Sequence, residues 1–144
     1  MTSTKIYDET TYQQELVLQQ QDSLKNACHC ARLAEEFRCK DVVLLDLTKI
    51  TPIADYFVIA TATNLRQTAA LIEEVRGIFK KRYQALPALE GGESQSWMLQ
   101  DFGTVILHVF VAEARELYDL EGLWADAPRL DWKKLLSSGA VQIS

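Results

Sequence analysis

The sequence predicts an α+β domain in which two long helices pack on a four-stranded mixed sheet. Two stretches with helical spacing of apolar residues, 23–37 and 65–79, alternate with apolar segments short enough to be strands. The order is helix, strand, strand, helix, strand, strand and short helix, which is typical of this class. Two long helices are too few to cover both faces of such a sheet. Part of one face should therefore be open or shared with a partner.

The composition indicates one soluble globular domain. Hydrophobic residues make up 48% of the 144-residue chain, enough for one core. No apolar run approaches the roughly 18 residues of a membrane span, and the N-terminus lacks the basic and apolar regions of a signal peptide. The cysteines, Cys28, Cys30 and Cys39, are odd in number and suit a reducing compartment. We therefore expect a cytoplasmic protein with free thiols.

The first long helix should begin at Ser23. From there apolar residues recur at helical spacing over about four turns, and Asp22 is of a type that caps helix N-termini. Residues 1–21 are polar and rich in glutamine, which indicates an appendage or a weak helix. We expect the domain to span residues 22–126, followed by a C-terminal tail at 127–144.

The apolar segments 41–47 and 56–63 are predicted to be strands, the first buried on both faces. Between them, Pro52 pushes the preceding residue out of helical geometry. The second long helix should start after Asn64, where Gln67 completes an Asn version of the capping box, and end in a basic run. Its predicted inner face consists of Leu65, Thr68, Ala69, Ile72, Val75 and Phe79.

A loop at 85–94, rich in proline and glycine, precedes the last pair of strands. Residues 96–100 and 104–111 are predicted to form these strands, joined by a turn in which Gly103 can take a positive φ. A short helix should run from Ala112 to about Tyr118.

No catalytic arrangement can be assembled from the motifs. The letters DFG at 101–103 lack the Gly-rich loop and catalytic loop of a kinase. Cys28 and Cys30 are two apart on a helix and point roughly 200° away from each other, so they cannot share a metal ion. Asp41 and Asp46 are an odd number apart on a strand and face opposite sides. We expect no enzyme activity, no cofactor and no metal.

Three interpretations remain open for His108, which shares its strand face with Ile106 and Phe110. It is a hydrogen-bonded histidine packed within an apolar face, a ring that contacts a partner, or a catalytic base. The third needs a positioned nucleophile, and the motifs supply none.

The segment from Asp101 to Asp131 carries seven acids and two bases, so a basic partner is favoured if this region binds one. A net charge of −5 argues against binding that depends on neutralising nucleic-acid phosphates. The large rings here, Trp97, Tyr118 and Trp124, are of types enriched at interfaces. The segment is either the edge of the core or a docking face.

Four segments resemble the family of ribosomal silencing factors, also called the Iojap family. They are 41–47, 54–71, 90–110 and 114–124, and the similarity covers about residues 22–126. The resemblance implies a fold related to nucleotidyltransferases but without their catalytic acids. It also implies binding to the large ribosomal subunit through a ribosomal protein on its subunit-joining face. Association with the small subunit would then be blocked sterically, which lowers translation when nutrients are scarce, and the free protein would form homodimers.

Eight residues match motif positions of the family, and we infer that some of them face the ribosomal partner: Trp97, Asp101, His108, Tyr118, Asp119, Leu120, Glu121 and Trp124. Asp119 and Glu121 are expected to be exposed, so that reversing both charges would weaken binding without unfolding the domain. The rival functions are a nucleotidyltransferase-like enzyme and a homodimeric adaptor without a ribosomal role.

Overall fold

A six-stranded mixed sheet forms the centre of the computed structural model, which describes residues 9–83, 88–90 and 96–143. Its strand order is β3-β4-β5-β2-β1-β6. The bounds are β1 Lys40–Asp46, β2 Tyr56–Thr61, β3 Ala88–Glu90, β4 Trp97–Asp101, β5 Val105–Phe110 and β6 Arg129–Leu130. The predicted α+β class and mixed sheet are confirmed, whereas the predicted number of four strands is wrong. The two additional strands, β3 and β6, are too short to produce a periodic pattern.

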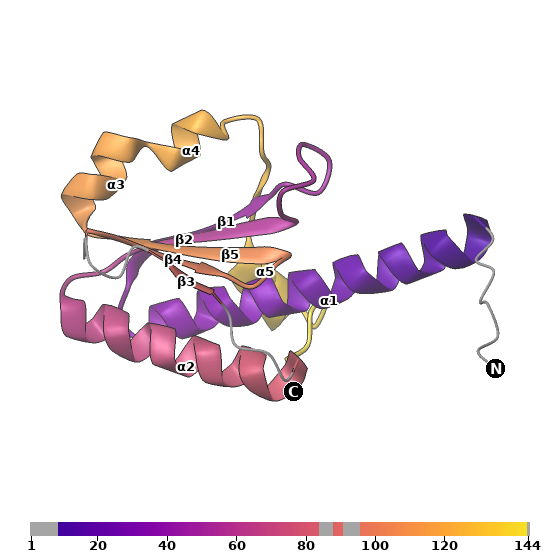
Figure 1. Ribbon diagram of the computed structural model, residues 1–144, viewed down its shortest axis with the longest axis horizontal. Helices are drawn as coiled ribbons and strands as arrows, with labels where there is room; N and C mark the ends of the chain where they lie inside the picture. Colours follow the sequence, from indigo (N-terminus) through magenta and orange to yellow (C-terminus); the bar gives the residue numbers. More distant parts are fainter. Residues whose placement is uncertain (1–8, 84–87, 91–95, 144) are drawn as a thin grey trace.

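The helices divide unequally between the two faces of the sheet (Figure 1). Their bounds are α1 Glu9–Glu36, α2 Leu65–Tyr83, α3 Ala112–Tyr118, α4 Leu120–Leu123 and α5 Trp132–Ser137. Both long helices, α1 and α2, lie on one face, while the short helices α3 and α4 lie on the other (Figure 1). The predicted shortage of helical cover therefore falls on the α3–α4 face.

Helix α1 begins at Glu9, well before the predicted start at Ser23. Asp22 lies inside the helix, so its assignment as the N-cap is wrong. Residues 9–21 are mostly Gln, Glu, Leu and Thr, and the first three have high helix propensity, which lets the helix continue toward the N-terminus. The interpretation of this stretch as a helix applies to residues 9–21, and residues 1–8 lie outside the described part of the chain.

The predicted cap of α2 is confirmed. Asn64 Oδ1 accepts a hydrogen bond from the Gln67 backbone N–H at 2.9 Å, and Gln67 Oε1 accepts from the Thr63 backbone N–H at 3.2 Å. Four of the predicted inner residues are confirmed as buried: Thr68, Ile72, Val75 and Phe79. Ala69 is exposed and Leu71 is buried in its place, because the buried stripe follows the 71/75 positions.

The parallel pair β2 and β5 is the most buried part of the sheet, since all twelve residues of the two strands are buried. Antiparallel strands flank it, with β1 beside β2 and β4 beside β5. The turn between β4 and β5 agrees with prediction: Gly103 has a φ of 90°, and its N–H donates to Asp101 Oδ1 at 2.8 Å. The predicted loop at 85–94 lies mostly outside the described residues.

Two clusters of buried side chains pack on opposite faces of the sheet. The first contains residues from α1, α2 and α5, such as Ala31, Val75 and Trp132, packed on the sheet. In the second, α3 and α4 contribute only Ala114 and Leu120 as buried residues, and Ala127 follows in the connection to β6. Consistent with this thin cover, Val43, Trp97 and Leu99 are only partly buried on that face.

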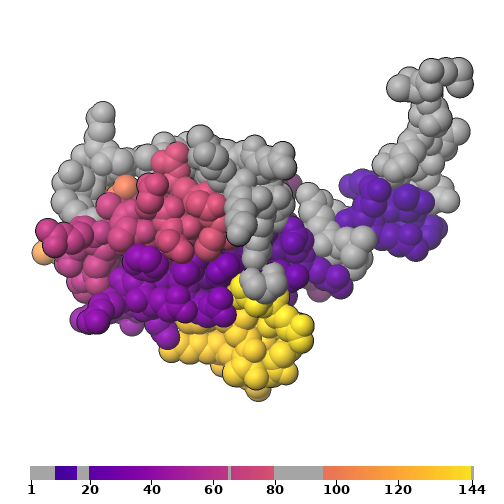
Figure 2. Space-filling model, turned by 90° about the horizontal axis from the view of Figure 1, so that it is seen from below, coloured from indigo at the N-terminus to yellow at the C-terminus, as the bar shows by residue number. Residues whose placement is uncertain are grey.

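The C-terminal segment packs beside α1 (Figure 2). Trp132 and Val141 are buried in the first cluster, and Trp132 Nε1 donates to the Val42 carbonyl oxygen at 3.2 Å. Residues 127–144 were expected to form a tail outside the domain. That division of the chain stays a prediction, but the packing of these two side chains joins the segment to the core.

We predict that Trp132→Ala lowers the free energy of unfolding by roughly 3 kcal/mol or more, because it removes a large buried ring and a hydrogen bond. Urea denaturation of the variant measures this effect. Lys134→Ala, at an exposed position of the same helix, is the matched control and should change stability by less than about 0.5 kcal/mol. Equal stability of the two variants would show that the segment adds nothing to the core.

Candidate docking site

A row of aromatic side chains crosses the α3–α4 face of the sheet. Trp97 on β4 stacks on Phe110 of β5, with ring centroids 5.0 Å apart. His108 meets Phe57 of β2 edge to face at 4.6 Å. Two rings from the helical segment complete the row: Tyr118 lies 5.0 Å from Trp97, and Trp124 lies 5.8 Å from Phe57. The sequence-predicted rings therefore come together through residues that are far apart in the chain.

His108 is a buried member of this row and is only 3% exposed. Its Nδ1 accepts a hydrogen bond from Trp97 Nε1 at 3.2 Å, so the proton of the neutral ring is on Nε2. Nε2 is buried and has no hydrogen-bond partner in the described part of the chain. Burial lowers the pKa of His108 to about 4. The geometry matches the interpretation of a packed, hydrogen-bonded histidine.

The eight sequence-predicted residues separate by exposure. Tyr118 and Asp119 are exposed, and His108 and Leu120 are buried. The other four are partly buried: Trp97, Asp101, Glu121 and Trp124. The carboxylate of Asp101 participates in the β4–β5 turn. These positions indicate that some of the eight residues support the surface from inside, whereas others are accessible to a partner.

Asp119 sits at the corner between α3 and α4. It adopts a left-handed conformation with a φ of 45°, and its side chain accepts a hydrogen bond from the Gly122 N–H at 3.2 Å. A Cβ atom at Gly122 would lie only 2.1 Å from Asp119 Oδ2. Glycine at 122 is thus what lets the aspartate cap α4 so closely.

Glu121 is not the exposed acid that the sequence suggested, since its side chain is only 18% exposed. Its two carboxylate oxygens accept hydrogen bonds from Arg115 at 2.8 Å and 3.2 Å, and Arg129 also pairs with it at 3.2 Å. Hydrogen bonding to Arg115 lowers the pKa of the Glu121 carboxyl, and its burial opposes that shift. Reversing charge at 121 would therefore disrupt an internal ion-pair network, so that proposed double reversal is not a clean test.

Two exposed leucines were not predicted as site residues, and the two arginines, Arg115 and Arg129, were counted only as the bases of the acidic segment. Leu117 and Leu123 are 78% and 75% exposed, although leucine is usually buried. With Tyr118, at 53%, they give the helical segment an apolar outer surface. Three neighbouring acids are exposed and form no ion pair within the described residues: Glu113, Glu116 and Asp126. We call the seven residues Glu113, Glu116, Leu117, Tyr118, Asp119, Leu123 and Asp126 the α3–α4 surface.

The helical spacing of α3 did not signal that Leu117 is exposed. Ala114 is the buried residue of this helix, and a side chain three positions later usually lies on the same helix face. Because α3 is short, the pattern could not show which flank faces solvent. The Arg115–Glu121 pair left no local signal, since its two members stand six residues apart on different helices.

The described residues were also compared with what a metal site needs. Among the residues that the structure describes, no three His, Cys, Asp or Glu side chains gather so that they could hold a metal ion. Cys28 and Cys30 are both buried against the sheet on α1. Asp41 and Asp46 lie near opposite ends of β1, and Asp46 accepts hydrogen bonds from the backbone and hydroxyl of Thr48.

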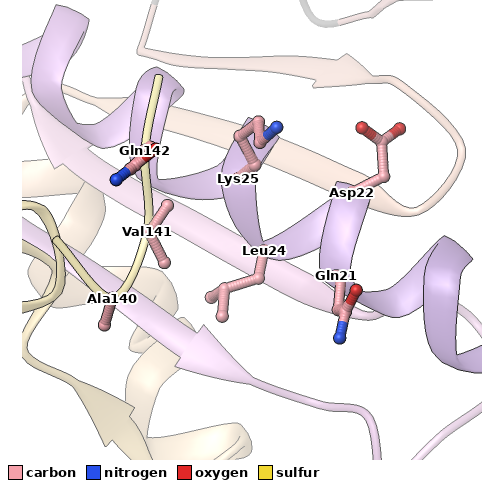
Figure 3. A pocket seen from close by; sticks show the side chains of 7 residues that line it. All are labelled: Gln21, Asp22, Leu24, Lys25, Ala140, Val141 and Gln142. Carbon is pink, nitrogen blue, oxygen red and sulfur yellow. The ribbon is translucent and has the colours of Figure 1, made fainter. Parts of the chain in front are cut away.

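A shallow depression lies between α1 and the C-terminal segment (Figure 3). Gln21, Asp22, Leu24 and Lys25 line it from α1, and residues 140–142 line it from the other side. Leu24 points toward Ala140 and Val141 (Figure 3). Its polar groups come from surface side chains, so the depression is a weaker candidate for a functional site than the α3–α4 surface. Within the described ranges, no helix combines the length and apolarity needed to span a membrane.

We predict that acid destabilises the protein through His108. The folded pKa, about 4, is below the ordinary value of 6.5, so between these values the unfolded chain binds a proton that the folded protein does not. Stability should therefore fall as pH decreases through this window, by about 2 kcal/mol between pH 7.5 and pH 5. Urea denaturation across this range measures it. His108→Asn should remove most of that dependence, and an unchanged slope would contradict the assignment.

We also predict that the three thiols resist alkylation in the native protein. Burial raises the pKa of Cys28 and of Cys39 to about 11, and raises that of Cys30 further above its usual range. The thiolate is the reactive species, so labelling at pH 8 should be slow until urea unfolds the chain. Mass spectrometry after iodoacetamide treatment measures this, and rapid labelling of the folded protein would be the contrary result.

Comparison with known proteins shows which family this chain resembles. Residues 20–142 match the family described as "Ribosomal silencing factor during starvation". The ribosomal silencing factor RsfS of Bacillus subtilis is 34% identical over 101 residues, which cover 70% of this chain and 86% of that protein. The mouse protein named "Mitochondrial assembly of ribosomal large subunit protein 1" is 28% identical over 95 residues, which cover 64% of this chain and 42% of that protein.

A solved structure shows the same likeness in three dimensions. The crystal structure of a protein from Chromobacterium violaceum aligns with a TM-score of 0.63 at 33% sequence identity, covering 73% of this chain and 85% of that one. The family match spans most of the chain and contains all of the α3–α4 surface. The chain therefore belongs to the ribosomal silencing factor family.

Proposed function

We propose that this protein represses translation by binding the large ribosomal subunit and sterically blocking its association with the small subunit when nutrients are scarce. The contact is made with a ribosomal protein on the subunit-joining face. Membership of the silencing-factor family supports a ribosome-associated role. The name of the mouse relative connects that protein with the large subunit. A cytoplasmic location, expected from the sequence, stays a prediction.

The α3–α4 surface is the observation that carries the proposal. Its exposed centre of Leu117, Tyr118 and Leu123 is apolar, and acids without an ion pair surround it. Interfaces commonly combine an apolar centre with a charged rim that selects the partner. Ribosomal proteins are generally basic, so an acidic rim fits them by charge.

We assign the eight predicted residues to two tasks within this proposal. Tyr118 and Asp119, being exposed, contact the ribosomal partner, as do the accessible edges of Trp97 and Trp124. The other four have a supporting task. His108, Leu120 and Glu121 lie beneath or beside the surface. Asp101 accepts a hydrogen bond from the Gly103 N–H in the β4–β5 turn, at the end of β4 away from Trp97. Pairing of the free protein as a homodimer stays a separate prediction, measurable by sedimentation equilibrium.

Co-sedimentation with purified ribosomal subunits tests the proposal directly. The protein should pellet with large subunits but not with small ones, and it should reduce the yield of joined ribosomes when both are mixed. A nucleotidyltransferase-like enzyme would instead bind a nucleotide with magnesium or manganese and turn it over. A homodimeric adaptor would do neither, so these measurements separate the three functions.

We predict that the double variant Glu113→Lys, Glu116→Lys stays folded and binds large subunits about tenfold more weakly at low salt. Both acids are exposed on α3, so their replacement should change stability little. The loss should shrink as salt increases, since exposed charges are screened.

The matched control is Glu73→Lys, Glu74→Lys. Glu73 and Glu74 are exposed, as Glu113 and Glu116 are. They lie on α2, across the sheet from α3. This control changes the net charge by the same amount and should leave affinity close to that of the wild type. Equal affinity loss in both variants would mean that overall charge, and not the α3–α4 surface, determines binding.

A further inference from the structure

We propose that Arg115 is a positioning residue, which holds the α3–α4 surface in its binding geometry by tying it to the edge of β1 and the end of β2. This inference rests on the proposed function, because it concerns how that same surface is held ready for its partner. Arg115 itself is mostly buried, with 12% of its side chain exposed, and therefore acts through the residues around it.

One guanidinium group joins four elements. Nε and one terminal nitrogen of Arg115 donate to the two carboxylate oxygens of Glu121 on α4. The other terminal nitrogen donates to the Asp41 carbonyl oxygen on β1 at 2.7 Å and to Thr61 Oγ1 on β2 at 2.9 Å. Such a planar fork fixes direction as well as distance, which an ammonium group could not do.

The backbone of β1 is shaped to receive this contact. Its pairing with β2 is irregular between Lys40 and Val43, and Asp41 takes a positive φ of 51°. A bulge of this kind removes a residue from the regular ladder. The Asp41 carbonyl oxygen is therefore available to the arginine.

The helical segment needs such a tether because few of its own side chains are buried. Helices α3 and α4 have seven and four residues, too few for stability on their own. Ala114 and Leu120 are the buried residues they contribute, and Asp119 turns the chain sharply between them. Burial of one alanine and one leucine holds the segment on the sheet, together with the ring contacts of Tyr118 to Trp97 and of Trp124 to Phe57. These apolar contacts lack the directionality of hydrogen bonds, so they leave the tilt of the segment weakly determined. The four hydrogen bonds of Arg115 supply the missing restraint.

Arg115→Gln and its control Arg129→Gln separate positioning from electrostatics. Both variants remove one positive charge beside the same Glu121 carboxylate. Arg129 is 61% exposed and lies on β6, so its ion pair with Glu121 joins the segment to the sheet only through a solvent-exposed contact, which contributes little. Coulomb attraction to a basic partner should become stronger in both variants, because each makes the surface more negative.

Positioning predicts the opposite sign for Arg115 alone. Arg115→Gln should weaken co-sedimentation with large subunits about tenfold, since a loosened surface must be ordered again on binding. Arg129→Gln should bind as well as the wild type or more tightly. Hydrogen exchange should become about tenfold faster at residues 112–124 of Arg115→Gln, while the amides of β5 stay protected. Wild-type or tighter binding by Arg115→Gln, or unchanged exchange, would overturn the proposal.

Thr61→Val tests the proposal even if Arg115→Gln fails to fold. This substitution removes one anchor of the guanidinium but keeps every charge and nearly the same side-chain volume. Exchange at residues 112–124 should increase by about threefold, with affinity weakened in proportion. If Arg115→Gln fails to fold and Thr61→Val behaves as the wild type, the inference is wrong. If the wild type does not bind large subunits, the proposed function fails, and the exchange measurements alone decide whether Arg115 positions the segment.

Discussion

The parallel pairing of β2 with β5 is the constraint on which the rest of this fold depends. Every residue of both strands is buried, so side chains must cover both faces of the sheet at its centre. The long helices α1 and α2 satisfy that requirement on one face only. The second face is left to α3, α4 and a row of aromatic rings. The thinly covered face is also the one whose helices expose leucine and tyrosine, which is why we place the docking site there.

A local irregularity in β1 connects the two faces. Asp41 and Val42 fall outside the regular pairing with β2, and side chains from different layers use their carbonyl oxygens. Arg115 of the α3–α4 segment donates to Asp41, while Trp132 of α5 donates to Val42. Backbone groups that a ladder does not pair take other partners, either side chains or water. The same bulge thus fixes the C-terminal helix on one side and the docking segment on the other.

Local chemistry made much of this fold predictable, and long-range chemistry did not. The Asn64–Gln67 cap and the turn at Gly103 depend on neighbouring residues, and both were predicted correctly. The start of α1 was missed because the N-cap rule names residues that can cap a helix without requiring one to begin there. The aromatic row could not be assembled in advance, since its members come from strands whose pairing order the sequence does not state.

The long-range contacts of the charged residues in the candidate site could not be predicted either. The sequence located an acidic segment correctly, but treating its acids as equivalent was wrong for Glu121. One acid is held by two arginines, another caps α4, and three form no ion pair in the described structure. Only acids of this last kind can meet a basic partner without first giving up an internal contact. The acids at this face therefore have two roles: some hold the corner between α3 and α4 together, and others are available to bind a partner. Arg115 pairs with an acid of the first kind and thereby positions the surface that carries the second.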